Sequence, residues 1–136
     1  VREREVINAP EHHALAREAG VKSIVLLKNE GGVLPLPTSG RKIALIGPCA
    51  ADVDNIFGPW TIWGDNEYRV SLEAGFRAAM TDPSALAVVQ GSDFEAPVAG
   101  GIEAAVAAAR AADVVVLAIG ESTRMSGEAQ SRTEID

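Results

Sequence analysis

Three short apolar runs alternate with helical patterns, and this alternation constrains the fold more than any other feature of the sequence. The runs occupy residues 42–48, 86–91 and 113–119. The first is apolar between residues that break regular structure, which is typical of a central parallel strand buried on both faces. Strands that alternate with helices predict right-handed crossovers, and therefore a parallel sheet with flanking helices. The predicted fold class is α/β, and three strands make only part of a sheet.

Two segments between these runs carry helical signals. Ser71 can cap a helix over residues 72–80, where apolar residues recur at helical spacing. Asp82, which is followed by proline, is expected to end that helix. Residues 102–112 are rich in alanine, the residue with the highest helix propensity, and predict a second helix.

A further helix is expected near the N-terminus. Asn8 and Glu11 are three residues apart and Pro10 lies between them, which predicts a capping box at the start of a helix. The buried apolar face of this helix is expected to begin at Leu15 and to run on into residues 24–27.

The composition argues against several classes of partner. The 136 residues carry a formal net charge of −7, which disfavours nucleic acid because such binding depends on clustered Lys and Arg. No apolar stretch reaches the roughly 18 residues that cross a bilayer, so no membrane partner is expected. Cys49 is the single cysteine, which excludes an internal disulfide, and we expect it to be a small buried residue. The sequence leaves the localisation unknown.

The segment directly after the third apolar run is the place where we expect chemistry. In open α/β sheets ligands bind at the carboxyl ends of the strands, and here residues 120–132 follow such an end and carry Glu121 and Glu128. A carboxyl group that is partly desolvated next to a leaving group can have its pKa raised far enough to act as a general acid near neutral pH. The alternative is an acidic loop that is simply solvated.

Other side chains are weaker candidates. Trp60 lies in a long loop over residues 50–69 and could either stack on the apolar face of a sugar ring or fold that loop back onto the sheet. Residues 47–50 lack the spaced glycines of a dinucleotide-binding turn. His12 and His13 are adjacent, so on a helix they diverge by about 100° and cannot share a metal. We therefore expect no cofactor and no metal.

Short motifs in a fixed order and spacing run along most of the chain. They are LAREA at 15–19, SIVLLKN at 23–29, LPL at 34–36, KIALIGP at 42–48, GPW at 58–60, ADVVV at 112–116 and MSGEAQSR at 125–132. Together they resemble the C-terminal domain of glycoside hydrolase family 3, and most of all that of bacterial β-glucosidases of the periplasmic type. The resemblance covers the chain from about residue 8 to Asp136.

This resemblance implies a fold, an activity and a site. Residues 1–136 would be part of an (α/β) sandwich domain, and a catalytic (β/α) barrel not present in this chain would be its partner in the same protein. The whole protein would be a retaining exo-acting β-glycosidase of the β-glucosidase type, which hydrolyses terminal non-reducing β-linked glucose. Carried onto this sequence, the resemblance makes Glu128 the favoured acid/base and Glu121 the second candidate. The aglycone side of the site would be lined by Met125, Ser131 and Arg132.

Two other expectations concern the chain by itself. The chain is expected to be an inactive fragment by itself, because a retaining mechanism needs a second carboxyl group roughly 5 to 5.5 Å from the first. An open apolar edge strand also predicts pairing with another copy, as a homo-oligomer or an aggregate. The rival interpretation is a non-catalytic α/β module that binds a ligand or a protein.

Overall fold

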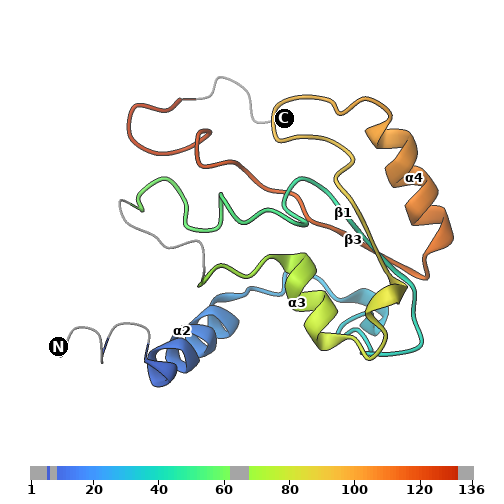
Figure 1. Ribbon diagram of the computed structural model, residues 1–136, viewed down its shortest axis with the longest axis horizontal. Coiled ribbons are helices and arrows are strands. Elements are labelled where there is room, and N and C mark those ends of the chain that lie inside the picture. The colour runs from blue at the N-terminus through green and yellow to red at the C-terminus, as the bar shows by residue number, and fades with distance from the viewer. Residues whose placement is uncertain (1–5, 7–8, 62–67, 132–136) are drawn as a thin grey trace. The chain divides into compact units, whose positions relative to one another are not determined.

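The computed structural model describes residues 6, 9–61 and 68–131. Contacts divide the chain into two compact units, Val1–Leu36 and Pro37–Asp136. The first unit contains helix α2 (Pro10–Ser23) and the 3₁₀ turn η1 (Glu30–Gly32), and the second contains the sheet and its helices (Figure 1). No helix in the described ranges is long and apolar enough to cross a membrane.

The second unit is built on a three-stranded parallel sheet, which confirms the predicted fold class. Its strands are β1 (Ile43–Ile46), β2 (Leu86–Val89) and β3 (Val114–Leu117), in the order β2-β1-β3. Every residue of β1 is at most 7% exposed. The central strand is therefore the one that the sequence predicts to be buried on both faces, since its apolar run lies between residues that break regular structure.

Two helices cover this sheet. Helix α3 (Leu72–Ala79) begins after Ser71, whose Oγ accepts a hydrogen bond from the Ala74 N–H at 3.1 Å, as the capping signal predicts. Helix α4 (Gly101–Ala111) contacts β1 and β2, and α3 contacts β2. The crossover from β1 to β2 and the one from β2 to β3 run in opposite directions, so right-handed connections place the two helices on opposite faces. Figure 1 shows the sheet between α3 and α4.

The edges of the sheet are β2 and β3. On β3 the side chains of Val115 and Leu117 are exposed, while Val114 and Val116 are half-buried. This alternation leaves one apolar face of the strand uncovered in the described part of the chain. Pairing of this edge with a second copy stays a prediction.

The first unit differs from its sequence-based expectation. Helix α2 begins after Ala9, which makes no side-chain capping bond, and Asn8 lies outside the described residues. The helix ends at Ser23 instead of continuing through residues 24–27. Ile24 already has an extended backbone, because β-branched residues lose side-chain freedom in a helix. The predicted buried face is also wrong: none of the helix residues is buried, and Leu15 is exposed.

Candidate functional site

The strand order changes sides at β1, because β2 is added on one side of it and β3 on the other. The connection after β1 leads to β2 on one side, and the connection after β2 returns to β3 on the other side. In open α/β sheets ligands bind at the carboxyl ends of the strands near such a point, where the segments that follow β1 and β3 lie. The two segments are here called the β1 loop (residues 47–61) and the β3 loop (residues 118–131).

The two loops leave the sheet in close contact. The Ala118 N–H donates to the Ile46 carbonyl at 2.7 Å, and the Cys49 N–H donates to the Ala118 carbonyl at 3.1 Å. Gly47 has a φ of +130°, and a Cβ added to it would lie 2.2 Å from the Ala118 oxygen. Only glycine fits at this position, because the backbones of the two loops meet where a side chain would stand.

An amide side chain joins the loops further out. Asn55 Oδ1 accepts a hydrogen bond from the Thr123 N–H at 2.8 Å in a partly buried contact. Asp52 holds Asn55 in turn: its Oδ1 accepts from Asn55 Nδ2 at 2.9 Å and its Oδ2 from the Asn55 N–H at 3.0 Å. The sequence analysis missed these residues. The only local signal is the three-residue spacing of Asp52 and Asn55, which is typical of a side-chain-stabilised turn.

The β1 loop is also braced by Arg69, which lies shortly before α3. Its Nη1 donates to the Val53 carbonyl at 2.9 Å and lies 3.6 Å from Asp54 Oδ1, and the guanidinium carbon is 4.4 Å from the centre of the Phe57 ring. Only 11% of the Arg69 side chain is exposed. Its Nε is buried without a hydrogen-bond partner in the described ranges. The sequence analysis gave Arg69 no role.

The favoured acid/base candidate lies in a tight turn of the β3 loop. The Gln130 N–H donates to the Gly127 carbonyl at 3.2 Å, and the φ of Ala129 is +62°. A Cβ on Gly127 would approach the Pro59 side chain to 3.0 Å, so the turn packs closely against the β1 loop. The Glu128 side chain at the tip is exposed and makes no hydrogen bond or ion pair with the residues that the structure describes. Its carboxylate is therefore available to a group that approaches from outside the loop.

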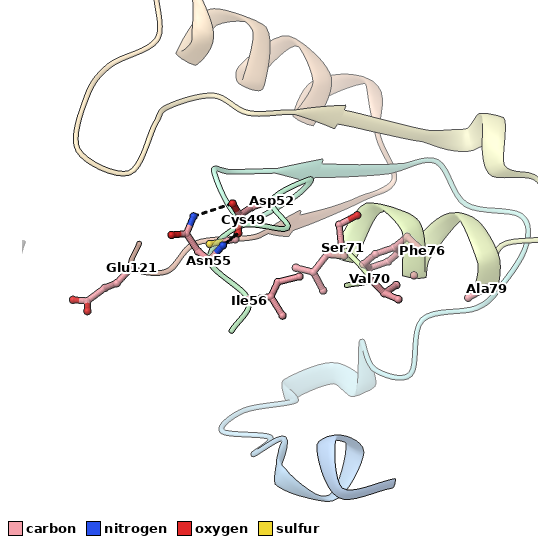
Figure 2. Close-up of a pocket in the computed structure, with 11 residues that line it drawn as sticks. Cys49, Asp52, Asn55, Ile56, Val70, Ser71, Phe76, Ala79 and Glu121 are labelled. Atoms are coloured by element: carbon pink, nitrogen blue, oxygen red, sulfur yellow. Dashed lines mark hydrogen bonds between the residues drawn. The ribbon is translucent and has the colours of Figure 1, made fainter. Parts of the chain in front are cut away.

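The second candidate, Glu121, has a different setting. It lines an open hollow of about 650 Å³ whose other walls come from α3 and the start of the β1 loop. The α3 side is apolar, with Val70, Leu72 and Phe76 among its lining residues. Figure 2 shows the Glu121 carboxylate directed away from Cys49 and the α3 side chains. The two glutamates thus belong to one loop but to different surroundings.

Cys49 also lines this hollow and is half-buried. Burial raises the pKa of its thiol above the ordinary value of 9.0, and the neighbouring Asp52 carboxylate raises it further. Both effects favour the protonated thiol, which is a poor nucleophile. Cys49 is thus less buried than the sequence analysis expects, but a structural role still describes it better than a catalytic one.

The remaining predicted site residues that the structure describes are Met125, Ser131 and Trp60. Met125 is half-buried within the β3 loop, where its sulfur accepts a hydrogen bond from the Ser122 N–H at 3.2 Å. Ser131 is exposed at the end of the described segment, and Arg132 lies outside the described residues. Trp60 is 68% exposed on the β1 loop, so its ring is not folded back onto the sheet. Among the described residues, no group of three or more His, Cys, Asp or Glu side chains is placed to hold a metal ion.

Comparisons with known proteins bear on both the fold and the site. A family model described as "Glycosyl hydrolase family 3 C-terminal domain" matches residues 24–136. A periplasmic beta-glucosidase from Salmonella typhimurium is 36% identical over 91% of the chain, and a beta-xylosidase from Formosa agariphila is 32% identical over 93%. The chain spans only 19% and 18% of the lengths of these two relatives.

A solved structure gives the same result. A beta-glucosidase from Listeria innocua, in a complex with isofagomine, superposes with a TM-score of 0.81 at 36% identity over 93% of the chain and 17% of that protein. Similarity at this level shows that the α/β fold with flanking helices is shared with that structure.

Proposed function

The chain belongs to the glycosyl hydrolase family 3 C-terminal domain family, and on that premise we propose that it supplies the general acid/base of a retaining, exo-acting β-glycosidase. Residues 1–136 are then part of the C-terminal (α/β) sandwich domain. The nucleophile comes from an N-terminal (β/α) barrel domain of the same protein. Because the chain covers less than a fifth of its relatives, this activity is proposed for the whole protein and not for the chain alone.

The placement of Glu128 is the observation that carries this proposal. Its turn lies on a loop at the carboxyl edge of the sheet, is closed by the Gly127–Gln130 hydrogen bond and packs on Pro59. The side chain itself has no partner in the described part of the chain. A carboxyl group whose backbone is fixed and whose side chain is not engaged by the described residues can reach a substrate that another domain holds.

In the proposed reaction Glu128 acts twice. It first protonates the glycosidic oxygen while the barrel carboxylate attacks the anomeric carbon, which releases the aglycone and leaves a glycosyl-enzyme ester. It then removes a proton from water as the water attacks the same carbon, which restores the free nucleophile and the protonated Glu128. Met125, Ser131 and Arg132 are proposed to line the aglycone side, and Trp60 is proposed as a further substrate-binding residue.

The proposed substrate is a terminal, non-reducing β-linked glucoside. The Salmonella and Listeria relatives are named beta-glucosidases, and the Listeria protein is seen with isofagomine and with gluconolactone. Relatives named beta-xylosidases have comparable identity, so β-xylosides are the competing substrates. The ratio of kcat/KM for aryl β-glucosides and aryl β-xylosides in the full-length protein tests this choice, and a ratio below one would reverse it.

The acid/base assignment is tested by Glu128→Gln in the full-length protein. For an aglycone that is a poor leaving group we expect kcat/KM to fall by about 10²- to 10⁴-fold, since that range is typical of general acid catalysis. Dinitrophenolate is a leaving group that needs no protonation, so the rate of the glycosylation step with a dinitrophenyl glucoside should change little. Azide, which attacks the glycosyl-enzyme without base assistance, should restore turnover and yield a glucosyl azide.

The matched control is Glu121→Gln, which changes the same functional group on the same loop. We expect it to affect good and poor leaving groups alike and to show no rescue by azide. The opposite result, with leaving-group dependence only in Glu121→Gln, would transfer the role to Glu121. If neither variant shows leaving-group dependence, the chain does not supply the acid/base, and a non-catalytic binding role becomes the better interpretation.

A further inference from the structure

We propose that Asn55, oriented by Asp52, is a positioning residue for the loop that carries the acid/base. The inference rests on the proposed function, because it assigns to Asn55 the task of holding the β3 loop where its carboxyl group reaches the glycosidic oxygen. Asn55 touches neither glutamate in the described contacts. It acts through the Thr123 backbone, which lies between Glu121 and Glu128 in the chain.

The hydrogen bonds around Asn55 are directional. An asparagine amide has one acceptor end and one donor end, and a rotation by 180° exchanges them. Asp52 accepts from the donor end at 2.9 Å, which leaves the oxygen facing the Thr123 N–H at 2.8 Å. In the rotated state the amide oxygen would face the carboxylate of Asp52 and the NH₂ group would face another N–H. The negative charge of Asp52 therefore selects the amide orientation that binds the β3 loop.

The surroundings make this contact effective. Asn55, Asp52 and Thr123 are all half-buried, so water competes less for these hydrogen bonds than it does at an exposed site. The contact connects residues that are 68 positions apart in the chain. A further contact between the loops, Gly127 on Pro59, lies directly before Glu128. The β3 loop is thus held against the β1 loop on both sides of the segment between Thr123 and Gly127.

A small displacement of this loop has a large expected effect. Proton transfer requires a heavy-atom distance of about 2.6–3.2 Å, and a misplacement of about 1 Å can cost on the order of 10²-fold in rate. Loss of the Thr123 contact would allow the loop to move by such an amount without unfolding the sheet. The consequence should be greatest for substrates that need protonation of the leaving group.

The test uses the full-length protein and a series of aryl β-glucosides whose leaving groups differ in pKa. We expect Asn55→Ala to lower kcat/KM by about tenfold or more for the poorest leaving groups and by less than about twofold for dinitrophenyl glucoside. The matched control is Asp54→Ala, one residue earlier, whose side chain is 80% exposed and faces Arg69. This variant should not lower kcat/KM for any substrate in the series.

A double-mutant cycle separates positioning from general destabilisation. If Asn55 acts through Glu128, then Asn55→Ala should add no leaving-group dependence in the Glu128→Gln background. Should Asn55→Ala not fold, Asp52→Asn is the second variant. It weakens the selection of the amide orientation, so the same dependence is expected at smaller amplitude.

A uniform loss of rate across all leaving groups would show that Asn55 only stabilises the fold, and would overturn the inference. Full additivity with Glu128→Gln, or no effect at all, would do the same. These results are distinct from failure of the proposed function, which is shown by Glu128→Gln and Glu121→Gln both lacking leaving-group dependence.

Discussion

Two four-residue apolar runs of nearly the same composition lie in opposite environments in this protein. Ile43–Ile46 forms β1, where each residue is at most 7% exposed. Residues 24–27, with the sequence IVLL, form no helix or strand and are 60–92% exposed. The runs differ at two positions: the second residue is alanine in one and valine in the other, and the last is isoleucine in one and leucine in the other. Apolar character alone therefore does not decide whether a run is buried.

The difference lies in what each run can pair with. β1 has a hydrogen-bonded parallel strand on each side and helices beyond both faces, so its backbone groups and its side chains are both satisfied. In the described part of the first unit, no strand pairs with residues 24–27. A strand becomes stable when several segments supply partners at once, which is why one apolar run forms a buried strand and a similar run stays exposed.

The largest expected effect comes from Gly47→Ala at the end of β1. Its Cβ would lie 2.2 Å from the Ala118 oxygen at a φ of +130°, so strain and overpacking together should cost about 3 kcal/mol or more. The control is Gly20→Ala in α2, where nothing lies within 4 Å and helix propensity should improve by about 0.5–1 kcal/mol. Native-state hydrogen exchange of the β1 and α2 amides measures both. Equal protection of β1 in both variants would contradict the steric argument.

The comparison between the two runs is tested directly by Leu45→Ala and Leu27→Ala. Leu45 is fully buried, so its truncation should cost about 2–5 kcal/mol in transfer and cavity energy. Leu27 is 92% exposed, and its truncation should change stability by less than about 0.5 kcal/mol. Thermal and urea unfolding measure the two effects. A cost at Leu27 close to that at Leu45 would mean that residues 24–27 are buried in solution.

A smaller effect is expected at the helix starts, since α3 has a side-chain cap and α2 has none. Ser71→Ala removes the acceptor for the Ala74 N–H and should cost about 1 kcal/mol. Ser71→Asp keeps an acceptor and should recover most of that loss. Exchange rates of the first α3 amides report the change. If both variants lose the same stability, Ser71 contributes through packing and not through its cap.

The smallest effect concerns pH at the turn before β2. Hydrogen bonds from the Ser84 hydroxyl and backbone lower the pKa of Asp82 below its ordinary 3.8. Because the folded pKa lies below the unfolded one, the associated stability is present above pH 3.8 and is lost as the pH falls through the folded pKa. An NMR titration should find the Asp82 pKa closer to 3.8 in Ser84→Ala. An unchanged midpoint would exclude the Ser84 hydroxyl as a cause.

The sequence predicts the elements of the second unit well because their signals are local. The three strands fall within the predicted runs, and α3 and α4 begin within a residue of the predicted positions. Breaking residues, a capping serine and helical spacing each act within a few residues along the chain. The prediction failed at the end of α2, where apolar periodicity suggested a longer helix than the β-branched Ile24 and Val25 support.

The candidate site is also predicted from the sequence only in part. The position of the β3 loop and its two glutamates follows from the rule that strands of open α/β sheets carry ligands at their carboxyl ends. The contacts that hold this loop, from Asn55 to Thr123 and from Pro59 to Gly127, join segments 68 residues apart in both cases. No local pattern encodes such a pairing, because it depends on which strands become neighbours.

The sequence by itself determined that three apolar runs become strands separated by helices, that the first run is buried on both faces, and that an acidic loop follows the third. The tertiary structure decided the order β2-β1-β3, the meeting of the β1 and β3 loops and the exposure of one of two similar apolar runs. Local propensities act within a few residues along the chain. Burial and loop-to-loop hydrogen bonds exist only after distant segments have been brought together, so they are properties of the fold and not of any one segment.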